Sequence, residues 1–299
     1  MFPLIILLFF FASIINVVFK FWTTDADFTL LSKKLKREEI EDKVVWITGA
    51  SRGIGEVLAR QLASLGAKLI LSARNQAELE RVKSQLTGKH APGDVKILPL
   101  DLASGEASIR EAVEKAESFF PESGVDYMIH NAACERPKSA ALDVTEESLK
   151  ATFEMSSAAG KVPAPAQTVY SASKFALNGY FHSLRSELFQ KGIKVTVVCP
   201  GPIETSKDSG AGSSGQPRLS EKRVSSERCA ELTIIAASNG LKEAWISYQP
   251  VLGVMYLVQY MPSVGFWLMD KVGEKRIEVA AQKGNTYSLD LLFGKSKKP

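Results

Sequence analysis

A glycine-rich turn between a buried strand and a helix constrains this 299-residue chain more than any other feature. Residues 43–48 form a short apolar, β-branched run, which predicts a buried parallel strand. The turn Gly49-Ala50-Ser51-Arg52-Gly53-Ile54-Gly55 follows and opens an amphipathic helix that we expect to end near Leu65. Missing side chains let the backbone approach a pyrophosphate, whose charge is favoured at a helix N-terminus. The turn therefore predicts a nucleotide phosphate site, with a plain tight turn as the alternative.

The tip of the second predicted strand indicates which nucleotide is bound. We expect this strand over residues 68–73, and Arg74 follows it directly. In nucleotide folds of this kind an acidic residue at the tip holds the ribose 2′-hydroxyl, whereas an arginine suits a 2′-phosphate. Arg52 in the glycine-rich turn adds a second cation. The pattern favours NADP(H) over NAD(H); the alternative is that Arg74 merely begins a solvated helix with Glu78 as its partner.

Strands and helices alternate along the next part of the chain. We expect, in order, a helix over 76–86, a strand over 95–100, a helix over 106–119 and a strand over 125–129. Asp101 and Asn131 follow the two strands. The alternation predicts a single α/β domain, over residues 43–249, with a doubly wound parallel sheet of the Rossmann type. Ligands of such a sheet lie at the carboxyl ends of its strands.

A tyrosine and a lysine four residues apart are the strongest candidates for chemistry. Residues 167–189 predict a long helix, so Tyr170 and Lys174 project from the same face. An ammonium group beside a phenol favours the ionised phenol and lowers its pKa towards neutrality. Ser157, thirteen residues before Tyr170, offers a hydroxyl that can donate a hydrogen bond to a substrate oxygen. Such pairs arise often by chance on helices, and this one gains weight from the nucleotide site.

After this helix the chain completes the domain and then becomes apolar. Strands over 194–199 and 243–248 are expected on either side of a helix over 226–238. The Ser- and Gly-rich stretch 206–226 predicts a mobile lid or a disordered loop. Residues 251–269 are apolar but contain glycine and proline, so we expect a hairpin that covers the substrate pocket or dips into a membrane surface. Residues 250–299 thus form a hydrophobic segment with a basic tail.

The first 22 residues predict a membrane anchor. Residues 2–19 carry no charge, and eighteen helical residues span ~27 Å, close to the hydrocarbon thickness of a bilayer. A cleaved signal peptide is the alternative, but no Lys or Arg precedes the run and no small-x-small cleavage site follows it. Basic residues between Lys20 and Arg37 favour a cytosolic catalytic domain. Residues 23–42 are then a polar linker.

Composition excludes two classes of function. The net charge of +4 is mild for this length, and no basic stripe with interleaved aromatic residues occurs, which argues against a nucleic-acid partner. Cys134, Cys199 and Cys229 are odd in number and lack the spacing of metal ligands. We therefore expect small buried cysteines and neither a disulfide framework nor a metal site.

Taken together, these motifs resemble the short-chain dehydrogenase/reductase family over roughly residues 43–248. The matches, in order, are Thr48-Gly49-x-x-x-Gly53-x-Gly55, Asp101, Asn131-Ala132-Ala133, Ser157, Tyr170-x-x-x-Lys174 and Pro200-Gly201. The N-terminal anchor and the tip Ala73-Arg74 look like a membrane-anchored branch of that family. This likeness implies a membrane location, in the endoplasmic reticulum.

The resemblance implies an oxidoreductase that transfers a hydride between NADP(H) and a hydrophobic alcohol or carbonyl compound, such as a lipid, steroid or retinoid. It implies that Tyr170 exchanges the proton, that Lys174 holds the nicotinamide ribose, and that Ser157 polarises the substrate oxygen. The residues that it assigns to the cofactor are Gly49, Ser51, Arg52, Gly53, Ile54, Gly55, Arg74, Asp101, Asn131, Tyr170, Lys174, Ile203 and Thr205.

The chain departs from the family at one place. In the family, the strand before the Asn131 position is followed by a long helix with a catalytic asparagine, and then by a core strand that delivers the serine. Here 25 residues separate Asn131 from Ser157, and no asparagine occurs between Asn131 and Asn178. No apolar β-run precedes Ser157. We infer an internal deletion of a central strand and most of one helix before Met155.

Two consequences follow from this deletion. Family members commonly form homodimers through the missing helix and the helix of Tyr170, so we expect dimerisation to be disfavoured. Removing a middle strand also leaves ladder groups of its neighbours unpaired, at about 1–3 kcal/mol for each buried amide. A catalytically impaired, nucleotide-binding and membrane-associated protein is therefore the alternative to an active enzyme.

Overall fold

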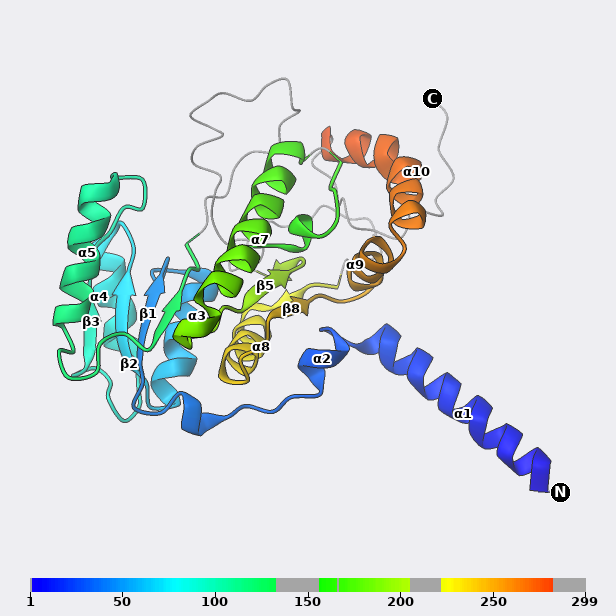
Figure 1. Cartoon of the computed structure of the whole chain (residues 1–299), viewed down its shortest axis with the longest axis horizontal. Coiled ribbons are helices and arrows are strands. Elements are labelled where there is room, and N and C mark those ends of the chain that lie inside the picture. The colour runs from blue at the N-terminus through cyan, green and yellow to red at the C-terminus, as the bar shows by residue number, and fades with distance from the viewer. Residues whose placement is uncertain (1, 133–155, 166, 205–221, 282–299) are drawn as a thin grey trace, which may run out of the picture.

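The first half of the chain folds around a four-stranded parallel sheet (Figure 1). The computed structural model describes residues 2–132, 156–165, 167–204 and 222–281. The strand order of the sheet is β3-β2-β1-β4, and every pair in it is parallel. The strands are β1 (Val44–Thr48), β2 (Lys68–Ser72), β3 (Val95–Ile97) and β4 (Tyr127–Ile129). The alternation of strands and helices that the sequence predicts for this half is confirmed.

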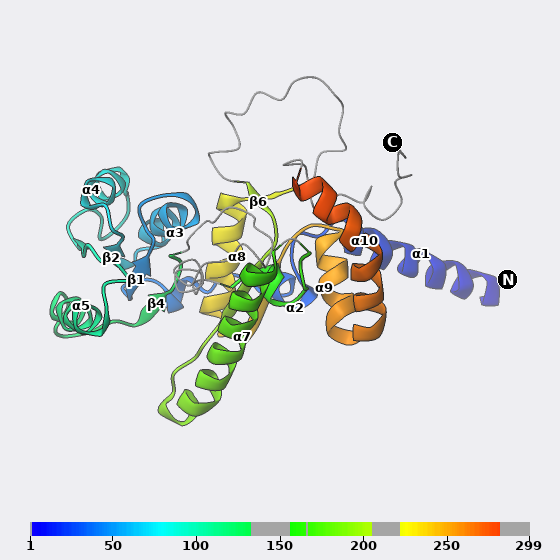
Figure 2. The ribbon, with the colours of Figure 1, turned by 90° about the horizontal axis from the view of Figure 1, so that it is seen from above.

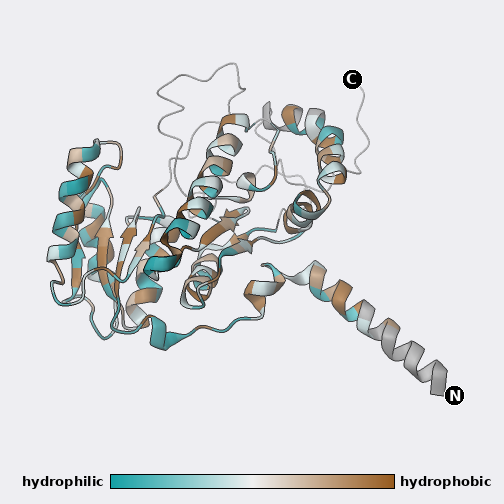
Figure 3. Cartoon of the chain, viewed as in Figure 1, coloured by the Kyte–Doolittle hydropathy of each residue, from teal (hydrophilic) through white to brown (hydrophobic). Residues whose placement is uncertain are grey.

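Helices cover both faces of this sheet. Figure 2 shows α3 (Gly53–Ser64) and α4 (Gln76–Gln85) on one face and α5 (Glu106–Ser118) on the other. Successive side chains of a strand point to opposite faces, so Val45 and Ile47 of β1 pack with α3, whereas Val44 and Trp46 pack with α5. All five β1 residues are buried, and the strands stand out as hydrophobic in Figure 3. Burial on both faces explains the continuous apolar run in the sequence.

The second half of the chain has its own small sheets. Strands β5 (Val197–Pro200) and β8 (Glu243–Ile246) form a parallel pair, and β6 (Ile203–Glu204) pairs with β7 (Val224–Ser225). Helix α7 (Thr168–Leu188) precedes β5, and α8 (Ser226–Ser238) precedes β8. The sequence predicts the bounds of α7 to within one residue and those of α8 without error. It does not predict the short β6–β7 pair.

The parallel sheet is divided between β4 and β5. In the part of the chain that the structure describes, β4 pairs with β1 alone and β5 pairs with β8 alone. Each is therefore an edge strand, and Met128 in the middle of β4 is 37% exposed. No strand of the described residues joins the two sheets. The segment before Met155, where the sequence leads us to infer the loss of a central strand, lies outside the described residues, so this inference stays a prediction. Among the described residues, the backbone groups along these two edges have no neighbouring strand.

Helix α8 and an N-terminal strap join the two sheets. Ala230 and Ile234 of α8 belong to the core of the first sheet, while Leu232 and Ile235 pack with β8 in the second. Gln61 of α3 also donates a hydrogen bond to the Glu227 carbonyl oxygen, at 2.8 Å. The two halves are thus held on one shared helix.

The strap is residues 24–42, which run along α8 and include α2 (Phe28–Leu31) and a 3-10 turn, η1 (Arg37–Glu39). Asp27 caps α2 and also accepts a hydrogen bond from the Trp245 amide at 2.7 Å. Asp25 pairs with Arg228 of α8 at 2.8 Å. Leu30 and Ile40 are almost fully buried. A stretch that the sequence presents as a polar linker is therefore packed at Ala26, Asp27, Leu30 and Ile40, whereas residues 31–39 are exposed.

Helix α1 (Phe2–Thr23) projects away from the sheets (Figure 1). Near its C-terminal end Ile15, Phe19 and Trp22 are each more than half exposed. Within the described parts of the chain, no helix meets the combined length and hydropathy that crossing a membrane requires. The anchor predicted for residues 1–22 thus stays a prediction.

The apolar C-terminal segment folds into a helical hairpin. It consists of α9 (Val251–Tyr260) and α10 (Pro262–Ala281). Gly265 allows the two helices to touch, because an added Cβ would lie 2.7 Å from the Val258 Cα. Leu252 and Met269 pack with Trp245 beside the β5–β8 pair. The hairpin itself is as predicted, while its covering of a substrate pocket or a membrane surface stays a prediction. Residues 206–221 of the predicted lid, Cys134 and the basic tail lie outside the described residues.

Candidate active site

The glycine-rich turn adopts a conformation that requires its glycines. Gly49 and Gly53 have φ values of +66° and +57°, a region that residues with a Cβ rarely enter. At Gly55 an added Cβ would lie 2.2 Å from the Gly49 carbonyl oxygen and 2.5 Å from Asn131 Nδ2. The turn is therefore a fixed structure at the carboxyl end of β1.

Helix α3 begins directly at this turn and presents its N-terminus. Its N-cap residue, Arg52, has an extended backbone, and no side chain caps the helix there. The first amides of a helix have no partner within the helix, and they favour a negative charge. The fixed turn and the uncapped α3 amides together fit the pyrophosphate of a dinucleotide.

Asn131 braces the turn from the end of β4. Its Nδ2 donates hydrogen bonds to the carbonyl oxygens of Thr48, at 3.1 Å, and Gly49, at 3.2 Å. The Thr48 hydroxyl accepts the backbone N–H groups of Asn131 and Ala132 in return. Asn131 is only 8% exposed. Asn131, which the sequence assigns to the cofactor, therefore stabilises the glycine-rich turn through its hydrogen bonds.

Arg81 is a second brace, which the sequence interpretation did not identify. From α4 its Nη2 donates to the Ser51 carbonyl oxygen, at 3.1 Å, and to the Glu56 carboxylate, at 2.9 Å. The guanidinium lowers the pKa of the Glu56 carboxyl, although partial burial opposes this. The sequence signal is weak: Glu78 and Arg81 have helical i, i+3 spacing, but Ser51 and Glu56 lie 25 or more residues away.

Replacing Arg81 by methionine is expected to weaken nucleotide binding several-fold. Methionine keeps much of the volume but leaves Ser51 and Glu56 without their shared donor, so the turn becomes less ordered. Titration of the intrinsic fluorescence of NADPH with each variant measures the Kd. Arg110→Met is the matched control, because Arg110 pairs with the exposed Glu106 on α5. An unchanged Kd for the Arg81 variant contradicts this role.

The cations assigned to the nucleotide lie at the surface near the turn. Arg52 and Arg74 are both exposed. Glu78, the alternative partner of Arg74, instead binds Arg81 at 2.9 Å. Asp101 follows β3 at the same sheet edge, where its carboxylate accepts the Ala103 amide at 3.1 Å. Arg52 and Arg74 are thus exposed cations that follow the carboxyl ends of β1 and β2.

Tyr170 and Lys174 meet on α7 as the spacing predicts. Lys174 Nζ lies 5.2 Å from the centre of the Tyr170 ring. Lys174 is 3% exposed, whereas Tyr170 is half-buried. The two side chains are thus neighbours on one face of α7, and this pair stays the candidate for proton exchange that the sequence predicts.

Ser157 sits in a tight turn against α7 and β5. It is the N-cap of a 3-10 turn, η3 (Ala158–Gly160), and its Oγ accepts the Ala159 amide at 3.2 Å. The same hydroxyl donates to the Pro200 carbonyl oxygen at 3.4 Å. Of the two residues predicted beyond β5, Ile203 lies in β6 next to Val224, and Thr205 lies outside the described residues.

A carboxylate network ties α7 to the second sheet. Glu243 of β8 binds His182 Nε2 of α7 and Lys161 Nζ, each at 2.8 Å, and also accepts from the Trp245 indole. Burial raises the pKa of the Glu243 carboxyl, but the hydrogen bonds of Lys161 and Trp245 outweigh it, so the pKa is lowered. The network holds the helix of Tyr170 on β8.

This lowered pKa predicts how stability depends on acid. A carboxyl whose pKa falls on folding stabilises the native state at pH values above its pKa in the unfolded chain. This contribution is lost as the pH drops through the pKa of the folded state. Melting temperatures measured from about pH 6 to about pH 3 should therefore fall more steeply for the wild type than for Glu243→Gln. Parallel curves would show that Glu243 contributes nothing to acid sensitivity.

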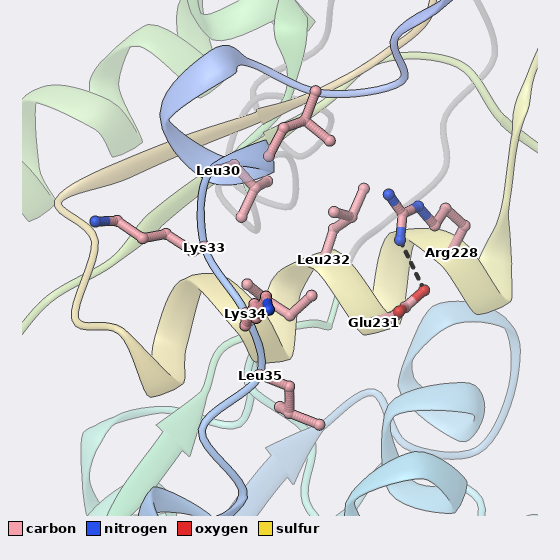
Figure 4. A pocket seen from close by; sticks show the side chains of 9 residues that line it. Leu30, Lys33, Lys34, Leu35, Arg228, Glu231 and Leu232 are labelled. Carbon is pink, nitrogen blue, oxygen red and sulfur yellow. Dashed lines mark hydrogen bonds and ion pairs between the residues drawn. The ribbon is translucent and has the colours of Figure 1, made fainter.

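An open groove of about 300 Å³ lies elsewhere on the molecule, between the strap and α8 (Figure 4). Leucines 30, 35 and 232 give it an apolar floor, and Lys33, Lys34 and Arg228 surround it. None of the predicted site residues lines this groove. The groove is therefore separate from the candidate active site.

The fixed glycine turn, the uncapped helix and the Tyr170–Lys174 pair define a nucleotide-dependent oxidoreductase. A model of the short chain dehydrogenase family matches residues 43–155 and 153–213. The chain therefore belongs to the short-chain dehydrogenase/reductase family, whose members use nicotinamide cofactors. The two matched segments meet at residues 153–155, where the sequence indicates the internal deletion.

Several curated proteins are similar to most of the chain. Dehydrogenase/reductase SDR family member 7 of Homo sapiens is 36% identical over 87% of this chain and 87% of its own length. A dehydrogenase/reductase SDR family protein 7-like protein of Drosophila melanogaster is 31% identical over 83% of this chain and 85% of its own. Hydroxysteroid 11-beta-dehydrogenase 1-like protein B of Xenopus laevis is 28% identical over 80% of this chain and 90% of its own.

Proposed function

We propose that the chain is an NADP(H)-dependent oxidoreductase that acts on a hydrophobic alcohol or carbonyl compound. The observation that carries this proposal is the Tyr170–Lys174 pair, with 5.2 Å between the ammonium and the ring centre. It occurs in a chain whose first sheet ends in a fixed phosphate-binding turn. Proton exchange and nucleotide binding are the two capacities that hydride transfer to a carbonyl needs.

In this proposal each residue of the site has one task. The bound nicotinamide supplies or accepts the hydride. The Tyr170 hydroxyl gives a proton to the carbonyl oxygen during reduction and takes it back during oxidation. Lys174 stabilises the ionised phenol and holds the nicotinamide ribose, and Ser157 donates a hydrogen bond to the substrate oxygen. The residues act together because orientation and charge stabilisation lower the same barrier.

The preference for NADP(H) rests on Arg52 and Arg74. Replacing Arg74 by alanine should raise the Kd of NADPH about tenfold and leave that of NADH within twofold, because a charge-assisted hydrogen bond to phosphate contributes about 1.5–3 kcal/mol. Fluorescence titrations with the two nucleotides measure the ratio. Arg110→Ala on α5 is the control. Equal losses for both nucleotides would mean that Arg74 does not contact the 2′-phosphate.

The substrate class and the membrane location are parts of the same proposal. A relative named as hydroxysteroid 11-beta-dehydrogenase 1-like supports a steroid or another lipid-like alcohol or carbonyl compound. The uncharged N-terminal run and the exposed Ile15, Phe19 and Trp22 of α1 support association with a membrane. The basic residues between Lys20 and Arg37 favour a catalytic domain on the cytosolic side. A lipid substrate and a membrane anchor are mutually consistent.

A second candidate function is nucleotide binding without turnover. The separation of β4 from β5 favours it, because a central strand that would place Ser157 is absent from the described residues. The lack of an asparagine between Asn131 and Asn178 points the same way. In this case the chain keeps the cofactor half of the fold and loses the catalytic half.

One experiment with the full chain in detergent separates the two functions. NADPH and NADH binding are followed by the shift in melting temperature, and hydride exchange is followed by NADPH absorbance with a panel of steroid, retinoid and lipid carbonyl compounds. A larger shift with NADPH together with turnover supports the oxidoreductase. A shift without turnover, with turnover restored when a family-type segment is inserted after Phe153, supports the second candidate. No shift with either nucleotide contradicts both.

A further inference from the structure

One buried amide holds the turn that carries Ser157. Asn178 of α7 is 5% exposed, and it follows Lys174 by one helical turn on the same face. Its Oδ1 accepts a hydrogen bond from the Ser156 hydroxyl, and its Nδ2 donates to the Gly160 carbonyl oxygen at 2.9 Å. One side chain is therefore bonded to both ends of the turn 156–160.

The turn also touches the α7 backbone at the position of Lys174. An added Cβ on Gly160 would lie 2.8 Å from Asn178 Nδ2 and 2.9 Å from the Lys174 carbonyl oxygen. The contact thus requires glycine at 160 and leaves no space between the turn and the helix. Ser157, three residues earlier, is fixed relative to the same helix that carries Tyr170 and Lys174.

Other restraints on Ser157 are weak in the described part of the chain. Its hydroxyl donates to the Pro200 carbonyl oxygen at 3.4 Å, a long hydrogen bond. Pro200 belongs to β5, and the Ser156 hydroxyl lies 3.5 Å from Cys199 Sγ of the same strand, so the polar contacts of the turn with the sheet are long ones. Asn178 differs from them because one side chain joins both ends of the turn to α7.

We infer that Asn178 is a positioning residue, which acts on the reaction through Ser157 by holding the turn 156–160 against α7. The inference rests on the proposed function, because it concerns the role of Ser157 in that reaction. Both halves of the amide are needed. Aspartate keeps an acceptor for Ser156 but turns an oxygen towards the Gly160 carbonyl, and leucine keeps the volume without either hydrogen bond.

Hydrogen exchange of the full chain tests the structural part without any turnover. The Ala159 and Gly160 amides donate to the Ser157 Oγ and carbonyl oxygen, at 3.2 and 2.8 Å, so their protection reports on the turn. Asn178→Asp should lower this protection about tenfold. Ser186→Ala, on the exposed side of α7, should leave it unchanged. Unchanged protection in the Asn178 variant overturns the inference.

Kinetics test whether Asn178 acts through Ser157. Asn178→Asp should lower kcat about tenfold and leave the Kd of NADPH within twofold. In a Ser157→Ala background the same substitution should have no further effect on kcat, because its target is gone. Multiplied effects in the double variant would instead show a general structural role, and they overturn the inference.

Two further comparisons separate a failure of this inference from a folding defect and from a failure of the proposed function. If Asn178→Asp does not fold, Ser156→Ala removes one hydroxyl and one of the two bonds, and it should show a smaller change in the same direction in both measurements. If the wild type binds NADPH but transfers no hydride, the proposed function fails. The exchange measurement still decides whether Asn178 holds the turn.

Discussion

Replacing Lys174 by alanine is expected to lower kcat by about 10²- to 10⁴-fold, the range that a positioned proton-transfer group contributes. The ammonium group lies 5.2 Å from the centre of the Tyr170 ring and is 3% exposed, so water cannot easily take its place. Its removal leaves the ionised phenol without a neighbouring positive charge. Steady-state kinetics in both directions measure the loss, and circular dichroism shows that the variant is folded.

Lys191→Ala is the matched control for this variant. Lys191 is exposed in the 3-10 turn η4 (Phe189–Lys191), which follows directly on α7. The control removes the same charge and volume from the far end of the helix, so its kcat should equal that of the wild type. A Lys174 variant with full rate would refute the assigned pair and favour nucleotide binding without turnover.

Replacing Gly55 by alanine is expected to abolish measurable NADPH binding and to lower the melting temperature. The new Cβ would lie 2.2 Å from the Gly49 carbonyl oxygen and 2.5 Å from Asn131 Nδ2, and the first of these atoms belongs to the backbone. The turn must therefore shift, and the bond between Asn131 and Gly49 is lost with it. NADPH titration and thermal unfolding of the same sample measure both effects.

Gly179→Ala controls for the change from glycine to alanine. Gly179 is exposed on α7, has no positive φ, and an added Cβ there meets nothing within 4 Å. Alanine should stabilise this helix by up to about 1 kcal/mol, so the control is expected to raise the melting temperature. Unchanged NADPH affinity in the Gly55 variant would show that the turn does not bind the phosphates.

The first half of the fold is predictable because its signals are local. Strand β1 is buried on both faces, so its sequence is a continuous apolar run. Gly49 and Gly53 after it have positive φ values, which favour glycine. The observed β2 and α4 end within one residue of their predicted bounds. Tyr170 and Lys174 are equally local, because helical geometry alone brings residues four apart together.

The features that the sequence did not predict depend on distant partners. The strap reads as polar because most of its residues are polar or charged. Two of them, Asp25 and Asp27, have Arg228 and Trp245 as partners about 200 residues later. Arg81 likewise supports a turn 30 residues before it. The loss of a central strand is an inference from the family pattern, and composition alone gives no sign of it. Contacts of this range require the fold to be known first.

The shared helix α8 decides whether the two halves unfold as one unit. Each sheet has its own buried cluster, and one face of α8 contributes to each. With β4 and β5 unpaired across the division in the described chain, the energetic coupling between the halves passes through α8, the strap and side-chain contacts such as that of His130 with Phe181 of α7. A nucleotide bound at the glycine-rich turn therefore stabilises the half that carries Tyr170 and Ser157 only as far as these contacts couple the two halves. If the coupling is weak, thermal unfolding should occur in two steps.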